Sequence, residues 1–266
     1  METVTIRGVE VPKLGLGTAR LTGEECREVV ETALELGYRH VDTAQLYGNE
    51  EAVGDAIARS AVDREEVFLT TKIHWDHAAA DDVHSSFADS LDRLGVDSVD
   101  LLLIHSTNDD VPIEETIGAM NRLQEEGTVE HIGVSNYSVE ETKTAVEASS
   151  TPVLTNQVEY HVDHGQADLL EWCVEHDVLL TAYSPLDEGS LASDPELEAI
   201  AERHDATAAQ VALAWLAEQP NVMTIPKASS EARLTENLSA IDVELTADER
   251  DRLFERSGGV PSLRSK

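Results

Sequence analysis

The sequence predicts an α/β fold, a (β/α)8 TIM barrel with an N-terminal β-hairpin. Short apolar runs recur along the chain, and an amphipathic helical pattern follows each of them. Strands that are apolar on both faces are typical of buried parallel strands, which crossover helices connect. One barrel needs about 250 residues, so we expect residues 1–266 to form a single domain.

The hairpin is expected in TVTIRGVEV, residues 3–11, where polar and apolar residues alternate around Arg7 and Gly8. Eight apolar runs then predict the strands of the barrel. These runs cover residues 14–17, 39–42, 67–72, 99–105, 131–135, 154–158, 178–183 and 222–226.

The segments between the strands repeat apolar residues at helical spacing. In residues 23–37, for example, Val29, Val30, Ala33 and Leu34 fall on one helical face. The other helical patterns cover residues 49–60, 80–95, 113–127, 139–149, 165–176, 194–204, 207–219, 230–241 and 246–258.

An open, doubly wound sheet is the competing architecture, because GLGTAR at residues 15–20 is similar to a dinucleotide-binding loop. That loop needs a third glycine or another small residue, and Arg20 stands at the position in question. We therefore favour the barrel.

The charge balance excludes a general nucleic-acid binder. The chain has 53 acidic residues against 19 lysines and arginines, a formal net charge of -34. Such a surface repels itself in dilute buffer, whereas at about 1 M salt the Debye length is only about 3 Å. The acids are scattered among helical patterns and 41% of residues are hydrophobic, so we expect a packed, salt-adapted protein.

The remaining composition predicts a cytoplasmic monomer without a metal. No segment matches a signal peptide or the roughly 20 apolar residues that span a bilayer. Cys26 and Cys173 are not spaced as a redox pair or thiolate metal site. The spacings His74-x-x-His77 and His161-x-x-His164 have no clear third ligand, so we expect no metal.

Polar residues end three neighbouring strands, where a barrel gathers its active site. Asp42 ends one strand with Tyr47 in the loop beyond, Lys72 ends the next, and His105 ends the third. Singly, these residues are compatible with a turn cap, a rim aromatic, a solvent-seeking lysine and a core histidine.

Together, the four residues suggest protonation of a carbonyl coupled to its reduction. A phenol has an ordinary pKa of about 10 and donates a proton poorly at neutral pH unless a cation stabilises the phenolate. Lys72 is suited to be that cation, Asp42 to hold it, and His105 to orient the carbonyl oxygen or pass the proton.

The chain resembles the aldo-keto reductase family, in particular short prokaryotic members similar to 2,5-diketogluconate reductases. The resemblance lies in VDTAQLYGNEEAVG, FLTTKIHWD, LLLIHS, IGVSNYS, NQVEYH, TAYSPL and IPKASSEARLTEN, in this order. It implies a catalytic tetrad of Asp42, Tyr47, Lys72 and His105, in which Tyr47 is the general acid in reduction and the general base in the reverse reaction.

The resemblance also implies a bound nicotinamide cofactor. Its carboxamide would contact Ser135, Asn136 and Gln157, and its ring would stack on Tyr183. For these residues helix capping, backbone hydrogen bonding and ordinary packing are the alternative explanations. The other cofactor positions implied by the resemblance are Gly17, Thr18, Asp42, Ser184, Leu186, Lys227, Ser229, Arg233, Glu236 and Asn237.

We expect NADPH as the cofactor, because Lys227 and Arg233 would meet a 2'-phosphate while Glu236 and Asn237 approach the adenine. Many relatives have a serine directly after this lysine, whereas this chain has Ala228 followed by Ser229. NADH therefore stays open as an alternative.

The expected substrate pocket consists of Tyr47, His74, Trp75 and His105. Relatives often carry tryptophan two residues after the catalytic lysine and again after the catalytic histidine, where this chain has His74 and Ser106. After the last helical pattern only VPSLRSK follows, from which we expect no long closing loop and an open pocket.

Three functions follow from these observations. The first is an NADPH-dependent reductase of small aldehydes, ketones or sugar-derived carbonyls. The second is a Schiff-base aldolase that uses Lys72. The third is a relative that binds the cofactor for regulation or redox sensing without significant turnover.

Overall fold

The computed structural model describes residues 2–259, so the expected short tail, residues 260–266, lies outside the described residues. Its strands form a two-stranded sheet, β1-β2, and an eight-stranded sheet in the order β10-β9-β8-β7-β6-β5-β4-β3. Strand order follows chain order and helices alternate with strands, which defines a (β/α)8 barrel fold. The chain divides into two compact units: unit 2 is Leu16–Gln157, and unit 1 holds the segments on either side of it.

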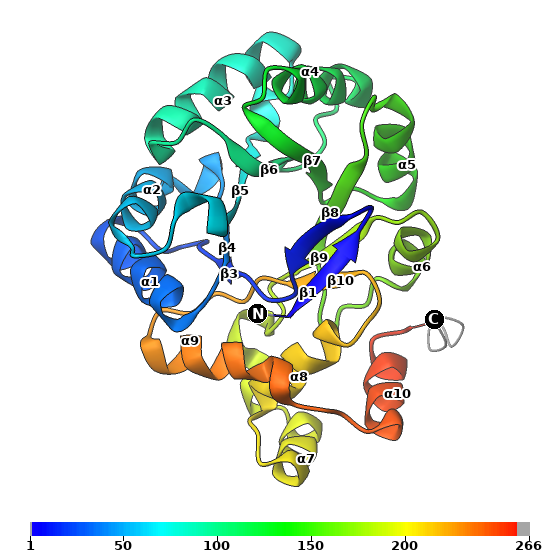
Figure 1. Cartoon of the computed structure of the whole chain (residues 1–266). Coiled ribbons are helices and arrows are strands. Elements are labelled where there is room, and N and C mark those ends of the chain that lie inside the picture. The colour runs from blue at the N-terminus through cyan, green and yellow to red at the C-terminus, as the bar shows by residue number, and fades with distance from the viewer. Residues whose placement is uncertain (1, 260–266) are drawn as a thin grey trace. The chain divides into compact units, whose positions relative to one another are not determined.

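Unit 2 contains the strands that carry the predicted tetrad. Neighbouring strands pair in parallel, with Gly17 opposite Asp42 and Lys72 opposite Leu103. Helices α1 to α5 cover the same face of these strands (Figure 1). The strands are β3 (Leu16–Gly17), β4 (His40–Asp42), β5 (Phe68–Ile73), β6 (Val99–Ile104), β7 (Val129–Ser135) and β8 (Val153–Glu159), whose last two residues lie in unit 1. The helices are α1 (Gly23–Leu36), α2 (Glu50–Arg59), α3 (Ala80–Leu94), α4 (Ile113–Glu125) and α5 (Val139–Ala148), with 3-10 turns η1 (Gln45–Tyr47), η2 (Arg64–Glu66) and η3 (Trp75–His77).

Unit 1 begins with the predicted hairpin, β1 (Thr3–Ile6) and β2 (Val9–Pro12). Arg7 and Gly8 both have positive φ, 50° and 84°, as a two-residue hairpin turn requires. The remaining elements are β9 (Leu179–Tyr183), β10 (Val222–Thr224), α6 (Ala167–Glu175), α7 (Pro195–His204), α8 (Ala208–Ala217), α9 (Glu231–Leu238), α10 (Ala247–Arg256), η4 (Asp187–Ser193) and η5 (Ser239–Asp242). The predicted hairpin, eight strands and ten helices are thus confirmed within residues 2–259.

Helix α1 shows why these segments form helices. Its apolar residues recur every three to four positions and are buried, among them Val30 and Leu34. Two glutamates occupy its first turn, where the helix dipole favours negative charge. Gly37 ends the helix in the left-handed conformation, with a φ of 106°.

No helix within residues 2–259 has the length and apolar character needed to cross a bilayer.

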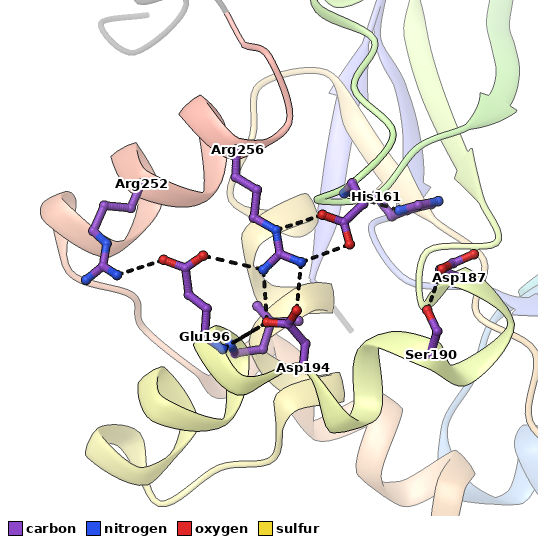
Figure 2. Close-up of polar contacts among 9 residues, drawn as sticks. His161, Asp187, Ser190, Asp194, Glu196, Arg252 and Arg256 are labelled. Carbon is purple, nitrogen blue, oxygen red and sulfur yellow. Dashed lines mark hydrogen bonds and ion pairs between the residues drawn. The ribbon is translucent and has the colours of Figure 1, made fainter.

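An ionic cluster fixes the end of α10 to the start of α7 in unit 1 (Figure 2). Arg256 lies 2.7 Å from carboxylate oxygens of both Asp163 and Asp194. Asp194 also accepts the backbone N–H groups of Glu196 and Leu197 at the start of α7. The hydrogen bond from Arg256 lowers the pKa of Asp194 to about 2. A charge-assisted, bidentate contact of this kind is geometrically specific, so it holds the last helix in one register.

Gly54 sets the packing distance between α2 and α3. A Cβ built at this position would lie 2.0 Å from the carbonyl oxygen of Leu94, which is backbone and cannot rotate away. Gly118, inside α4, has no heavy atom within 4 Å of the same position. At Gly54 a side chain is sterically excluded, whereas at Gly118 glycine only adds the entropic cost that it has in any helix. Comparing substitutions at the two positions therefore isolates the steric effect.

We expect Gly54→Ala to lower the free energy of unfolding by about 1–3 kcal/mol, because α2 and α3 must move apart. Gly118→Ala should raise it by about 0.5–1 kcal/mol, since alanine favours the helix and meets nothing. Urea denaturation of both variants at one fixed salt concentration measures the difference. Equal effects of the two substitutions would contradict this account of α2–α3 packing.

Candidate active site

A buried ion pair joins the ends of β4 and β5. Lys72 Nζ lies 2.5 Å from Asp42 Oδ1, and the two side chains are 0% and 2% exposed. The ammonium also donates to the carbonyl oxygen of Thr43 at 2.8 Å. Burial lowers the pKa of Lys72, but the charge of Asp42, the phenol of Tyr47 and hydrogen bonds to both raise it further, so the net shift is upward. Lys72 is therefore a cation at neutral pH.

Tyr47 approaches this ion pair from the turn η1. Lys72 Nζ lies 3.4 Å from the Tyr47 hydroxyl and 4.9 Å from the ring centroid. Burial raises the pKa of Tyr47, the charge of Lys72 lowers it, and Asp42 raises it again, with a net upward shift. The lysine thus acts in the direction expected from the sequence, but burial outweighs it. At neutral pH the phenol is protonated and holds a proton to donate.

His105 follows β6 and faces Tyr47 edge to face, with ring centroids 5.7 Å apart at 85°. Its backbone N–H donates to Ile73 at the end of β5. Burial, aided by the charge of Lys72, lowers the pKa of His105 to about 3. Nδ1 is buried and has no hydrogen-bond partner within residues 2–259. His105 is therefore a neutral imidazole, which can donate one hydrogen bond and accept another.

Two residues of the predicted substrate pocket stand beside the tetrad. The Trp75 ring lies 5.9 Å from that of His105 at 78°, and His74 packs on Trp75 with centroids 4.0 Å apart. The tryptophan that falls one place later than in many relatives thus brings an indole next to His105. Asn108 fixes this turn by donating to the Trp75 carbonyl oxygen at 2.9 Å.

Sequence reasoning missed Gln45 and Leu46, which precede Tyr47 in η1. Leu46 is 48% exposed, unusual for a large apolar residue in this chain. Gln45 makes four hydrogen bonds to segments more than 25 residues away. Their position directly before the phenol was the available signal, but nothing in the sequence indicates those partners.

The polar residues expected to hold the nicotinamide carboxamide lie around Asp42 and His105. Gln157 Nε2 donates to Asp42 Oδ2 at 2.8 Å, and Ser135 Oγ donates to the Gln157 carbonyl oxygen at 2.8 Å. Asn136 Nδ2 donates to the His105 carbonyl oxygen at 2.9 Å. None of these is the cap of α5, because Ser138 fills that role.

Gly17 and Thr18 adjoin the same group. Gly17 pairs with Asp42 in the sheet, and Thr18 Oγ1 donates to the Asp42 carbonyl oxygen at 2.9 Å. Asn136 has a φ of 60°, a left-handed conformation that non-glycine residues adopt rarely. Such backbone is often found at ligand-binding positions. Unit 2 therefore brings together the tetrad, Gly17, Thr18, Ser135, Asn136 and Gln157.

The other predicted cofactor residues belong to unit 1. Tyr183 ends β9, and Ser184 follows it with a φ of 47°. Leu186 immediately precedes η4, while Asn237 is buried in α9 and Glu236 is half-buried.

Arg233 is exposed in the first turn of α9, and Lys227 and Ser229 are exposed in the segment that precedes the helix. Within residues 2–259, neither cation forms an ion pair. Ser230 caps the helix by accepting the Arg233 backbone N–H. Two unpaired cations beside a helix N-terminus form a suitable site for a phosphate.

His161 lies near Glu159 and Asp187, with candidate metal-ligand atoms of the three residues within 4.8 Å of one another. His161 Nδ1 accepts the Asp163 backbone N–H, so the neutral ring carries its proton on Nε2, which faces Glu159 at 3.5 Å. His164 contacts His161 through backbone hydrogen bonds. The absence of a metal stays a prediction.

The fold and this arrangement of side chains define a reductase of the aldo-keto type. The Aldo/keto reductase family model matches residues 13–255, so the chain belongs to this family. It is an oxidoreductase that acts on carbonyl or alcohol groups of small molecules, and the family uses a nicotinamide cofactor.

Three similar proteins place the chain within the family. An aldo-keto reductase of Mycolicibacterium vanbaalenii is 41% identical over 240 residues, which cover 90% of this chain and 86% of that protein. Glyoxal reductase of Bacillus subtilis is 38% identical, with 92% and 89% covered. Methylglyoxal reductase DkgB of Escherichia coli O157:H7 is 38% identical, with 94% and 98% covered.

A solved structure described as a candidate 2,5-diketo-D-gluconic acid reductase B superposes with a TM-score of 0.94. It is 43% identical, and the match covers 98% of this chain and 92% of that one. The predicted barrel and the predicted family resemblance are thus confirmed.

The low pKa of His105 has a measurable consequence. An exposed histidine titrates near pH 6.5, whereas we expect no titration of the His105 ring in the folded protein between pH 8 and pH 5. The unfolded chain binds this proton below about pH 6.5, so the contribution of His105 to stability should be lost as the pH falls from there towards 3.

Proton and nitrogen NMR of the imidazole rings tests this, with the resonance of His105 assigned by its loss in His105→Asn. A midpoint for the His105 ring between pH 5 and pH 8 would contradict a neutral imidazole at the site.

Proposed function

We propose that this protein is an NADPH-dependent aldo-keto reductase that reduces aldehyde, ketone or sugar-derived carbonyls to alcohols, with Tyr47 as the general acid. One observation supports this above all others. The hydroxyl of Tyr47 lies 3.4 Å from an ammonium that a buried carboxylate holds in place, and a neutral imidazole packs edge to face with the phenol ring.

The proton is supplied by the protein. As the carbonyl carbon is reduced, negative charge develops on its oxygen and the O–H bond of Tyr47 breaks to protonate it. The phenolate that remains lies beside Lys72, whose charge stabilises it. Asp42 keeps Lys72 in position without accepting the proton.

His105 orients the substrate in this proposal. As a neutral imidazole it donates a hydrogen bond to the carbonyl oxygen and leaves Tyr47 as the stronger proton source. Trp75 and His74, whose rings are tilted by 30°, form an aromatic wall next to it, suited to a small carbonyl compound.

When bound, NADPH supplies the hydride. Ser135, Asn136 and Gln157 would hold its carboxamide, and Tyr183 would stack on its ring. Gly17, Thr18, Asp42, Ser184 and Leu186 would complete the contacts along the cofactor. Lys227, Ser229 and Arg233 would bind the 2'-phosphate, while Glu236 and Asn237 would contact the adenine.

The names of similar proteins support small dicarbonyls and sugar-derived acids as substrates. Two are a glyoxal reductase and a methylglyoxal reductase, and a structural neighbour is described as a candidate 2,5-diketo-D-gluconic acid reductase. The charge of -34 supports a monomer that works in a salt-rich cytoplasm.

The charged state of Lys72 makes the aldolase function less favourable. A Schiff-base lysine attacks as a neutral amine, so such enzymes lower its pKa. Here the net shift of the Lys72 pKa is upward, and the ammonium is fixed by Asp42 and the carbonyl of Thr43. A regulatory relative without turnover would have no use for this placement of Tyr47.

Replacing Tyr47 by Phe tests the proposed acid. We expect kcat for carbonyl reduction to fall by about 10²–10⁴, because the proton source is lost. Binding of NADPH, followed by quenching of protein fluorescence in high salt, should change little. Turnover at the wild-type rate in Tyr47→Phe would reject the role of Tyr47, and cofactor binding without turnover of any carbonyl by the wild type would favour the regulatory function.

Cofactor preference gives a separate test. We expect kcat/KM to be at least about tenfold higher with NADPH than with NADH, since a paired phosphate is worth about 1.4 kcal/mol or more. Arg233→Ala should reduce kcat/KM for NADPH and leave that for NADH nearly unchanged. Equal values for the two cofactors in the wild type, measured at high salt, would overturn the NADPH assignment.

A further inference from the structure

We infer that Gln45 is a positioning residue, which holds the turn of the general acid and the aromatic wall of the pocket in one geometry. This inference rests on the proposed function, because it assigns Gln45 a role in the reaction of Tyr47. Gln45 lies two residues before Tyr47 and contacts two segments distant in sequence.

The side-chain amide of Gln45 donates to one of these segments. Nε2 lies 3.0 Å from the Ser86 carbonyl oxygen and 3.0 Å from Ser90 Oγ, both on α3. These contacts tie η1 to a long helix of 15 residues whose apolar side chains, such as Val83 and Phe87, are buried. The turn is thereby joined to a rigid element.

The amide oxygen of Gln45 accepts from the second segment. The backbone N–H of His74 lies 2.9 Å from Oε1, and His77 Nδ1 lies 3.1 Å from it. An amide side chain has two N–H donors and two acceptor lone pairs. Gln45 uses all four, so its orientation is fixed and neither a shorter nor an apolar side chain can replace it.

Apolar burial does not hold either of the turns that Gln45 joins. Neither η1 nor η3 has a buried residue, and η1 has no side-chain cap. Tyr47 belongs to η1 and Trp75 to η3, so the two site residues sit on short turns that apolar burial does not hold. Hydrogen bonds hold these turns instead: Asn108 and the cap by His74 act on η3 alone, whereas Gln45 joins η1 to η3 and to α3.

A chain of polar contacts, which passes through the exposed Arg93, extends the support of Gln45 towards Lys72. Ser90 accepts from Arg93, and Arg93 Nε lies 2.8 Å from Glu50 at the start of α2. Glu50 accepts from Thr71 Oγ1 at 2.6 Å, one residue before the lysine. The segments around Tyr47, Lys72 and Trp75 are therefore connected by one set of side chains behind the site.

Loss of Gln45 should change the relative placement of Tyr47 and Trp75. If Gln45 is removed, Tyr47 stays on the chain and the ion pair of Lys72 stays intact, but the phenol and the indole wall lose their fixed separation. A displacement of about 1 Å can cost up to about 10² in rate. The cofactor positions around Asp42 do not depend on Gln45.

The test compares Gln45→Leu with Gln124→Leu. Gln124 is also half-buried and makes three side-chain hydrogen bonds, but it lies on α4, which carries none of the site residues. We expect kcat/KM for a carbonyl substrate to fall about tenfold or more in Gln45→Leu, through both kcat and KM. The Kd for NADPH should stay within about twofold, and Gln124→Leu should keep the wild-type kinetic constants.

Fluorine NMR of protein labelled with 5-fluorotryptophan gives a readout that is independent of turnover. The chain has three tryptophans, and Trp172 and Trp215 are buried, so their resonances report the integrity of the fold. We expect the Trp75 resonance to shift or broaden in Gln45→Leu while the other two stay in place. In Gln124→Leu all three should match the wild type.

Gln45→Glu serves as a second variant if the leucine variant does not fold. It keeps the oxygen that accepts from His74 and His77 but loses the donors to α3, so its effects should be smaller and of the same kind. If the wild type reduces no carbonyl, the proposed function fails and the Trp75 resonance alone decides on Gln45. An unmoved Trp75 resonance in a folded Gln45 variant, or kinetic constants equal to those of Gln124→Leu, would overturn the inference.

Discussion

The buried ion pair between Lys72 and Asp42 is the interaction on which the site depends. Removing two charges from water costs several kcal/mol for each ion, and the pair persists only when hydrogen bonds satisfy both groups. Here the carbonyl of Thr43 and the amide of Gln157 complete the pair, and Thr18 binds the backbone at Asp42. Strands β4, β5 and β8 and the residue after β3 are thus held together by a single polar centre. Side chains that hydrogen-bond to this ion pair therefore have little freedom to move.

The electrostatics of Tyr47 follow from that centre. The pair has no net charge, so its effect on the phenol depends on distance and orientation; the ammonium hydrogen-bonds to the phenol, and its charge affects the Tyr47 pKa more than that of Asp42 does. Burial still dominates and keeps the phenol protonated. A protonated phenol beside a cation suits a general acid, because the charge that appears on its oxygen after proton transfer is stabilised only at that stage.

The fold, and the meeting of Asp42, Tyr47, Lys72 and His105 in one place, could be predicted because their signals are local. Apolar runs mark strands, and a polar residue at the end of such a run marks the active-site edge of a parallel sheet. The sign of the Tyr47 pKa shift could not be predicted, because it depends on burial and not on the identity of the neighbour. The hydrogen-bond partners of Gln45 could not be predicted either, since they lie in helix α3 and in and just before turn η3, 29 to 45 residues further along the chain.

Several cations of this acidic chain are paired with carboxylates, but two of them are not. Arg93 is paired with Glu50, Arg256 with Asp163 and Asp194, and Lys72 with Asp42. Lys227 and Arg233 form no ion pair within the described residues, although 53 acids are available. At about 1 M salt, charges more than about 3 Å apart are screened, so long-range attraction would contribute little to binding of an anion. Only direct contact, in which a guanidinium and an ammonium replace the water around a phosphate, keeps its strength under those conditions.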